Sequence, residues 1–512
     1  MKINLVPNAS AEKNFSYWCT WATQNFSIPS VDANNKPVDP TIFEGVQGSM
    51  LARNNLNEKI LFENPGWVTN YFSKIRSDLY LMFDDGWDVG YGLGPKDIRK
   101  FGSLEVSELR FPSCTGNPAE RLYKLNKKVK EHGWRGAGLW VASQPAVKDT
   151  VELTVLELEE YYRERAKWCK YAGIEYWKVD WGMNGSIDYR KMMTRIVREV
   201  APDLAVEHAF CSVPLFGEYR SEKEYLQNVV DLLSFSDIFR TYDYLQQLAV
   251  PTTIDRISQI LLKANTGTDN MGLLNCEDEV YLAVALGFAF GAMRHPLWNE
   301  RPTMNYDPYN IKKRNDEVVR AARWQRISPP FGIGKSKAYI DTKILSDKWF
   351  FEKGETWCDA VLNKEIIQSA PAIISRGMPL PEVKTDGIPP FVVSSQNPNG
   401  TVAIATLPRA IEGKRISVPL ADICLDINDS TSPIGVFGYY RSLTLKLPVR
   451  PDNNRIYAQD LAGDEAVDIT EKVRYDSNKI IIPGDLIKEI GTSSAEKGDI
   501  SDPGLVLNIR KN

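Results

Sequence analysis

Asp180 and Lys178, a carboxylate and a cation, stand two residues apart at the end of a predicted strand. Residues i and i+2 of a strand point to the same face, so we expect the two side chains to lie together. A neighbouring cation favours the ionised form of a carboxylate, and an attacking nucleophile needs that form. A structural ion pair at a strand end is the alternative, and this segment alone does not separate the two interpretations.

Three more acidic residues, Asp84, Asp85 and Asp88, fall within five positions directly after another predicted strand. Crowding negative charge is costly, so such clusters often bind hydroxyl groups, cations or a metal ion. The alternative is a solvated turn, because Asp and Gly are also frequent turn residues.

Units of helix, glycine and strand position these acids. Residues 154–172 start with a capping box, Thr154 and Glu157, and carry apolar residues at helical spacing. Gly173 supplies a left-handed stop, and residues 174–179 are β-branched or aromatic, as in a strand. A second unit at 120–140 repeats this order, which predicts a parallel α/β architecture, here a (β/α)8 barrel. The predicted strands cover 17–21, 78–83, 135–140, 174–179, 204–208, 236–243, 271–275 and a segment near 293–297. The predicted helices cover 70–77, 120–131, 154–172, 189–200, 251–263 and a buried apolar run at 280–293.

The pattern changes after Arg326. The segment Ser328-Pro329-Pro330-Phe331-Gly332-Ile333-Gly334 reads as a domain boundary. Short alternating segments follow, separated by Gly, Pro and Asn turns, at 348–352, 401–407, 415–419, 435–447, 479–482 and 505–509. They predict an antiparallel β-sandwich. We therefore expect a catalytic barrel over residues 1–328 and a β-sandwich domain over residues 335–512.

Composition narrows the possible partners. A net charge of −4 gives no basic footprint for nucleic acid. Three histidines are too few for a His-rich metal centre, so no metal and no cofactor are expected. The seven cysteines are dispersed, which favours buried thiols and a reducing compartment. The longest apolar run, 280–293, is too short for a membrane span, so no membrane partner is expected. The first residues lack a signal's apolar core, which leaves a cytoplasmic protein or an exported one with its signal trimmed.

Tryptophan placement adds a substrate class. Eleven of the thirteen tryptophans precede residue 325, and four stand at or just past predicted strand ends: Trp21, Trp87, Trp140 and Trp181. An aromatic face there can stack on a sugar ring, although most buried tryptophans only fill a core. The residues that converge on the expected mouth of the barrel are Trp21, Asp84, Asp85, Trp140, Lys178, Asp180, Arg240 and Asp243. Two carboxylates flanking a tryptophan-walled pocket are what glycoside hydrolysis requires, with an oligosaccharide or polysaccharide side chain as substrate.

Three motifs resemble those of the retaining α-galactosidases of glycoside hydrolase families 27 and 36. They are Trp18-Cys19-Thr20-Trp21, Asp84-Asp85-Gly86-Trp87 and Lys178-Val179-Asp180, with Arg240-Thr241-Tyr242-Asp243 as a looser match. The resemblance extends in motif order from about residue 15 to residue 300, and to the C-terminal β-domain. It implies that Asp180 is the nucleophile, that Asp84 and Asp85 bind O4 and O6 of a galactose-type ring, and that Trp21 and Trp140 line the pocket. It further implies that Lys178 and Arg240 contact sugar hydroxyls.

The chain departs from that family in three places. The family's acid/base aspartate follows the arginine by four residues, where this chain has Tyr244; Asp243 is therefore our assignment, with Asp237 in reserve. Trp181 follows the nucleophile where a smaller or polar residue is usual. Glu207 and His208 stand where the family reads the C2 substituent, which leaves galactose, N-acetylgalactosamine and L-arabinopyranose open.

Two other classes stay open beside the hydrolase. A catalytically inactive glycan-binding protein would keep the tryptophans and lose the acid/base geometry, and the unusual spacing after Arg240 points that way. A metal-dependent barrel hydrolase would use Asp84 and Asp85 as ligands, which the scarcity of histidine disfavours. Oligomeric state is not predictable from these features.

Overall fold

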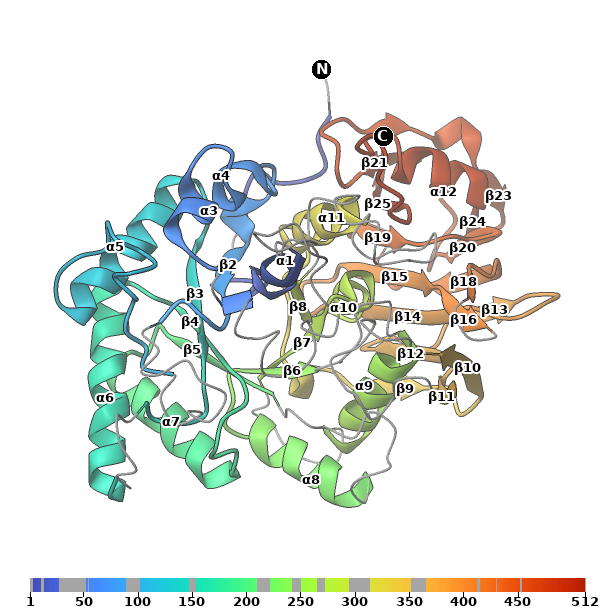
Figure 1. Ribbon diagram of the computed structural model, residues 1–512. Coiled ribbons are helices and arrows are strands. Elements are labelled where there is room, and N and C mark those ends of the chain that lie inside the picture. Colours follow the sequence, from blue (N-terminus) through green and yellow to red (C-terminus); the bar gives the residue numbers. More distant parts are fainter. Residues whose placement is uncertain are drawn as a thin grey trace.

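A closed barrel of eight parallel strands forms the N-terminal part of the chain (Figure 1). The computed structural model describes residues 3–10, 13–26, 52–53, 55–88, 102–146, 153–209, 222–241, 250–264, 272–293, 314–350, 365–411, 415–429, 431–451 and 454–511. The strands pair in chain order, and β8 returns to β1 to close the barrel. They are β1 (Tyr17–Cys19), β2 (Tyr80–Phe83), β3 (Gly136–Val141), β4 (Tyr176–Val179), β5 (Ala205–His208), β6 (Ile238–Thr241), β7 (Leu273–Glu277) and β8 (Ala289–Ala292).

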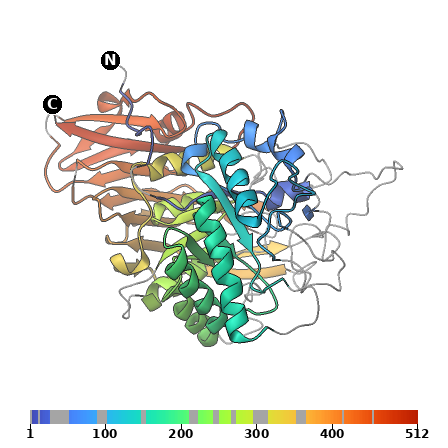
Figure 2. The same cartoon turned by 90° about the vertical axis from the view of Figure 1, so that its left-hand side faces the viewer.

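Helices cover the outside of this barrel (Figures 1 and 2). Those described are α1 (Trp21–Phe26), α3 (Glu58–Phe62), α4 (Trp67–Asn70), α5 (Pro118–Glu131), α6 (Val155–Ala172), α7 (Ile187–Val200), α8 (Glu222–Leu233), α9 (Val250–Ala264), α10 (Val280–Ala285) and α11 (Asn315–Gln325). The expected capping box of α6 is present, with Thr154 and Glu157 bonded to each other's backbone, and Gly173 ends the helix in the left-handed conformation. The fold class predicted from the sequence is confirmed.

Side chains alternate between the inside of the barrel and the helical layer. Tyr17, Tyr80, Tyr176 and Ile238 pack together inside, and their sequence neighbours join the large core beneath the helices. Polar residues an even number of positions further along a strand point inward as well, so they line the inner side of its C-terminal end. This alternation therefore decides which residues can meet at the mouth.

Two predicted elements differ from the structure. The helix expected at 70–77 is the short α4 followed by a 3-10 turn at Arg76–Asp78. The apolar run at 280–293 forms α10 only as far as Ala285, then turns at Gly287 with φ +68° and continues as β8. The eighth strand therefore precedes the segment near 293–297, most of which lies outside the described residues. Short apolar runs do not distinguish a buried helix from a buried strand.

The C-terminal part contains two larger sheets. One has eight strands in the order β22-β21-β25-β19-β15-β14-β12-β9, and the other has five in the order β13-β18-β20-β24-β23. The pairs β12–β14, β15–β19 and β18–β20 are parallel, so these sheets are mixed and not purely antiparallel as predicted. The bounds are β9 (Ala338–Ile340), β10 (Ile344–Phe350), β11 (Glu365–Pro371), β12 (Ile373–Arg376), β13 (Glu382–Lys384), β14 (Phe391–Gln396), β15 (Val402–Leu407), β16 (Arg409–Ile411), β17 (Arg415–Ser417), β18 (Asp422–Asp426), β19 (Ile434–Phe437), β20 (Ser442–Lys446), β21 (Asn454–Asp460), β22 (Val467–Asp468), β23 (Arg474–Asp476), β24 (Lys479–Pro483), α12 (Gly484–Gly491) and β25 (Gly504–Lys511).

The sheets pack against one side of the barrel, along α10 and α11 (Figure 1). Arg376 of β12 donates to the carbonyl oxygens of Leu286, just beyond α10, and of Gly332, after α11. Both ends of the chain lie on this side of the molecule (Figure 2), where Leu5 N donates to Gln459 Oε1 at 2.6 Å. None of the described helices has the length and apolar character needed to cross a membrane.

Candidate active site at the barrel mouth

Asp180 directly follows β4, and both of its carboxylate oxygens are held by donors from other strands. Trp140 Nε1 on β3 donates to Oδ2 at 2.9 Å, and Arg240 Nη2 on β6 donates to Oδ1 at 3.1 Å. The Asp180 backbone is fixed as well, since its N–H donates to Val141 O at 2.9 Å and its carbonyl accepts from Arg190 Nη2 at 2.9 Å. The carboxylate is therefore oriented, nearly buried and paired with a cation at the C-terminal end of the barrel.

Lys178 has a different partner from the one that its sequence position suggests. Its Nζ donates at 2.6 Å to Asp84 Oδ2 at the end of β2, which is separated from β4 by β3. Cys19 Sγ donates to the same oxygen at 3.0 Å, and the N–H of Asp85 donates to Asp84 Oδ1 at 2.9 Å. Burial lowers the pKa of Lys178, but Asp84 together with Cys19 and Glu277 outweighs burial, so the pKa is raised and the amine stays charged. The ion pair of Asp180 is with Arg240 instead.

Asp85 has partners of its own, which differ from those of Asp84. Arg53 binds its Oδ2 through Nε at 2.7 Å, and Gln24 Nε2 donates to its carbonyl at 3.0 Å. Burial raises the pKa of Asp85, and Arg53 opposes that shift. Asp84 and Asp85 are thus two separately neutralised carboxylates, and each keeps lone pairs that can accept further hydrogen bonds.

Arg240 joins Asp180 to two glutamates: Glu207, which the sequence analysis placed beside the C2 substituent together with His208, and Glu277, which it did not place in the site. Nη1 donates to Glu277 Oε2 at 2.7 Å, and Nε lies 3.3 Å from Glu207 Oε1. Glu207 also accepts from the hydroxyls of Tyr17 and Tyr176 and from Asn275 Nδ2, so it anchors Arg240 from below. Burial lowers the pKa of Arg240, but the surrounding carboxylates, Glu277 first, raise it overall.

Both glutamates carried a signal in the sequence. Glu207 lies two residues after Ala205, whose side chain points into the barrel, so Glu207 points inward as well. Glu277 likewise lies two residues after Asn275 and faces the same side at the end of the seventh strand. Extending the same-face argument of Lys178 and Asp180 to every strand would have selected them. Burial raises the pKa of Glu277 to about 7, against the opposing effect of Arg240.

His208 and Asp237 do not join this group. His208 faces the helical layer, where its ring nitrogens lie 2.8 Å from Thr194 Oγ1 and 3.3 Å from Arg190 Nη1. It was predicted to contact the sugar, but Glu207 occupies the inward position beside it. Asp237 precedes β6 at the opposite end of the barrel, accepting from Arg198 Nη2 at 2.9 Å and Val206 N at 2.9 Å. It is therefore ruled out as the reserve acid, while Asp243 lies outside the described residues.

The tryptophans divide into packed and open ones. Trp87 and Trp140 are both fully buried; Trp87 donates to Trp140 O at 3.0 Å and so supports the wall, whereas Trp140 reaches the site through its Nε1 bond to Asp180. Trp21, at the start of α1, is half-buried against the interior cluster. Trp181 is 38% exposed and meets Trp140 edge to face, with ring centroids 6.4 Å apart. An open aromatic face thus stands beside Asp180.

Comparison with known proteins adds a likeness of fold. No model of a protein family and no curated protein matches the chain. The α-amylase from Geobacillus thermoleovorans is 10% identical, over 98% of this chain and 99% of that one, with a TM-score of 0.40. An Anoxybacillus α-amylase is 9% identical, over 98% of this chain and 99% of that one, with a TM-score of 0.42. The cyclomaltodextrin glucanotransferase CldA is 10% identical, over 98% of this chain and 100% of that one, with a TM-score of 0.42. At such low identities and TM-scores, the activity of this chain has to be argued from its own residues.

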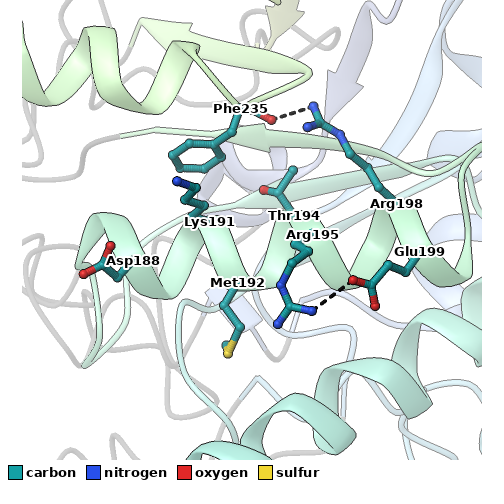
Figure 3. Close-up of a pocket in the computed structure, with 8 residues that line it drawn as sticks. All are labelled: Asp188, Lys191, Met192, Thr194, Arg195, Arg198, Glu199 and Phe235. Atoms are coloured by element: carbon teal, nitrogen blue, oxygen red, sulfur yellow. Dashed lines mark hydrogen bonds and ion pairs between the residues drawn. The ribbon is translucent and has the colours of Figure 1, made fainter.

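A separate cleft of about 580 Å³ lies on the outer wall of the barrel (Figure 3). Most of its lining comes from α7: Asp188, Lys191, Met192, Thr194, Arg195, Arg198 and Glu199, with Phe235 from beyond α8. Three of its charged side chains are already paired: Arg195 Nη1 donates to Glu199 Oε1 at 3.0 Å, and Arg198 Nη2 donates to Asp237 Oδ1 at 2.9 Å. Thr194 and His208 separate this cleft from the barrel interior, so it is not part of the group around Asp180. Within the described ranges, no group of three or more His, Cys, Asp or Glu side chains is arranged to hold a metal ion.

Proposed function

We propose that the chain is a retaining glycoside hydrolase that cleaves terminal α-galactosides, or a closely related sugar such as α-N-acetylgalactosamine or β-L-arabinopyranose. The observation that supports this most is the setting of Asp180, whose two oxygens are held by Trp140 and Arg240 at the barrel mouth. Catalytic residues of such barrels collect at this end. The sugar class rests on the motifs around Asp84 and Lys178 that resemble α-galactosidases.

In this mechanism an oxygen of Asp180 attacks the anomeric carbon while the bond from that carbon to the leaving oxygen breaks. A second carboxyl group gives its proton to the leaving oxygen, and Asp243 is the candidate that the sequence supplies. Water then attacks the glycosyl–Asp180 ester, gives its proton to the second carboxylate, and releases Asp180. Two inversions at one carbon return the original configuration.

The polar groups around Asp180 suit the binding of a sugar ring. Asp84 and Asp85 keep free lone pairs for ring hydroxyls, while Lys178 holds Asp84 and Arg53 holds Asp85 in place. Trp21 and Trp140 are proposed to line the ring's apolar face. Because Asp84 and Lys178 are buried, a sugar without the matching hydroxyl would leave part of their hydrogen-bonding capacity unfilled, which favours selectivity for the correct epimer.

The decisive experiment replaces Asp180 with Ala and follows hydrolysis of an aryl α-galactoside. We expect kcat to fall more than about 1,000-fold, because the covalent step is lost. Added azide should restore turnover and give a glycosyl azide of inverted configuration, whereas the wild-type product should be retained by NMR. Asp386→Ala, at an exposed position on the β-domain, is the matched control and should keep full activity.

The same assay separates the alternative classes. A wild-type chain that binds galactosides without turning them over would be a glycan-binding protein. Activity that a chelator removes would indicate a metal-dependent hydrolase. Near-normal activity of Asp180→Ala, or a wild-type product of inverted configuration, would overturn the assignment of Asp180.

A further inference from the structure

Glu277 is a carboxyl group with one oxygen engaged and the other without a partner. It ends β7 and is buried at the barrel mouth. Oε2 accepts from Arg240 Nη1 at 2.7 Å, whereas Oε1 is shielded from solvent and has no hydrogen-bond partner among the described residues. The buried, ionised form of such a group is costly unless a donor reaches the second oxygen. A proton on Oε1, or a ligand group beside it, removes that cost.

Glu277 and Asp180 are bound to one guanidinium. Nη1 of Arg240 serves Glu277, and Nη2 serves Asp180 at 3.1 Å. A guanidinium is planar and rigid, so its two terminal nitrogens hold the two carboxyl groups close together. Close carboxyl groups suit retention, which needs a separation of roughly 5 to 5.5 Å, and do not suit inversion, which needs roughly 6.5 to 9.5 Å to admit water.

We propose that Glu277 is the acid/base catalyst that works with Asp180. This assignment rests on the proposed function and changes one role within it, since the proton donor inferred from sequence was Asp243. The protonated carboxyl of Glu277 donates from Oε1 to the leaving oxygen as the bond from the anomeric carbon breaks and the Asp180 ester forms. Water then adds to the anomeric carbon, its proton passes to Oε1, and the ester bond breaks. Each cycle returns both carboxyl groups to their starting state.

The charges around Glu277 suit both halves of this cycle. Arg240 and Lys178 favour its ionised form, while burial and Asp278 favour the protonated form, and the pKa is raised to about 7. A group that titrates near neutral pH can both give and take a proton. When Asp180 becomes an ester, it loses its charge and competes less for Arg240. Arg240 then stabilises ionised Glu277 more strongly, as the second step requires.

The test compares the full chain with Glu277→Gln on aryl α-galactosides whose leaving phenols range from acidic to weakly acidic. Glutamine keeps the acceptor for Arg240 and cannot give a proton. We expect kcat/KM to fall about 100-fold or more for the weakly acidic phenols and to change little for dinitrophenol, which leaves without help. Azide should react with the glycosyl–Asp180 ester of Glu277→Gln and give an azide of retained configuration. Glu365→Gln, an exposed position on β11, should change neither reaction.

Several outcomes would overturn the role of Glu277 and leave the proposed function standing. One is an equal loss on all leaving groups. Another is an Asp243→Asn variant that shows the leaving-group pattern and the retained azide while Glu277→Gln does not. If Glu277→Gln folds poorly, Glu277→Asp replaces it, and its rate must then depend more steeply on the leaving group than the wild-type rate does. A wild-type chain inactive on every glycoside would instead overturn the proposed function itself.

Discussion

Arg240 holds three carboxylates with one side chain, and this fixes the relative positions of Asp180, Glu207 and Glu277. Each nitrogen of its fork has its own acid. A lysine in its place would offer one compact charge and no fork. The geometry of the proposed nucleophile therefore depends on a guanidinium, and a positive charge alone does not replace it.

We expect Arg240→Lys to lower kcat at least 100-fold and to cost about 3 to 5 kcal/mol of unfolding free energy, because it leaves buried carboxylates unpaired. Urea denaturation and steady-state kinetics would measure the two effects. Arg441→Lys, in the half-exposed pairs with Asp386 and Asp422, should change stability by no more than about 0.5 kcal/mol. Equal effects of the two substitutions would contradict the conclusion that the Arg240 guanidinium positions the three carboxylates.

The buried carboxyl of Glu277 also predicts a dependence of stability on pH. Its pKa is raised in the folded chain from 4.5 to about 7, so the folded state binds more protons than the unfolded state between these values. Unfolding free energy should therefore fall as pH rises through this window, by about 3 kcal/mol from this group. Asp88 acts in the same direction, since burial and then Asp85 raise its pKa to about 7.

Glu277→Gln should remove its part of that decline, measured by urea unfolding at pH 5 and pH 8. Glu365→Gln should follow the wild-type slope. A variant with an unchanged slope would mean that Glu277 does not hold a proton in the folded chain.

The sequence selected most of the residues at the mouth but not their pairing. Asp84, Asp85, Lys178 and Asp180 stand at strand ends, as the helix–glycine–strand units predicted. The partner of Lys178 could not be predicted, because it comes from β2, and a linear pattern shows neighbours along a strand and not across a barrel. The place of His208 was predictable, since Glu207 and His208 are adjacent and only one can point inward.

At the scale of the strands, Gly291 lets the barrel close. It lies on β8, pairs with Tyr17 of β1 and Glu277 of β7, and a Cβ placed on it would lie 2.4 Å from the Tyr17 ring. Tyr17 in turn donates to Glu207 at 3.2 Å. The small residue on β8 therefore makes room for an aromatic layer beneath the proposed active site.

Gly291→Ala should destabilise the chain by about 1 to 3 kcal/mol or more, because neither the Tyr17 ring nor the paired strands can move freely. It should also lower activity through Tyr17 and Glu207. Gly185→Ala is the matched control, since a Cβ there meets nothing within 4 Å. Thermal unfolding of both variants would measure this loss of stability. Equal melting temperatures would show that β8 accommodates the methyl group without a loss of unfolding free energy.

Strand order along the chain was more predictable than strand bounds. Seven of the barrel strands lie where β-branched and aromatic runs precede polar ends, and β8 was hidden inside an apolar run read as a helix. Gly287, in the left-handed conformation, separates α10 from β8, and its Cβ would meet the Phe331 ring at 2.0 Å. That packing is a tertiary effect, which periodicity alone does not encode.

At the scale of the whole molecule, the barrel and the C-terminal sheets share buried contacts. Arg320 of α11 binds Asp460 of β21 through Nε at 2.9 Å and Nη2 at 3.2 Å. Tyr281 of α10 donates to Asp502 O at 2.9 Å, and Trp324 packs on Phe437. The change of pattern after Arg326 predicted the second set of sheets. It could not predict their mixed strand directions, because alternation is the same in parallel and antiparallel strands.

The bond between Arg320 and Asp460 gives a direct test of this coupling. Arg320→Met keeps an apolar stem but, among the described residues, leaves Asp460 with only the backbone N–H groups of Ala462 and Ser494. Removing one partner of a buried ion pair costs about 3 to 5 kcal/mol, so urea unfolding should shift by that amount. Arg455 lies on β21, as Asp460 does, and Arg455→Met breaks an exposed pair with Asp468 of β22, which should cost no more than about 0.5 kcal/mol. If both variants unfold alike, the contact does not stabilise the folded chain. If Arg320→Met alone unfolds early while its kcat per folded molecule is unchanged, the sheets support the barrel through this contact without acting on the chemistry.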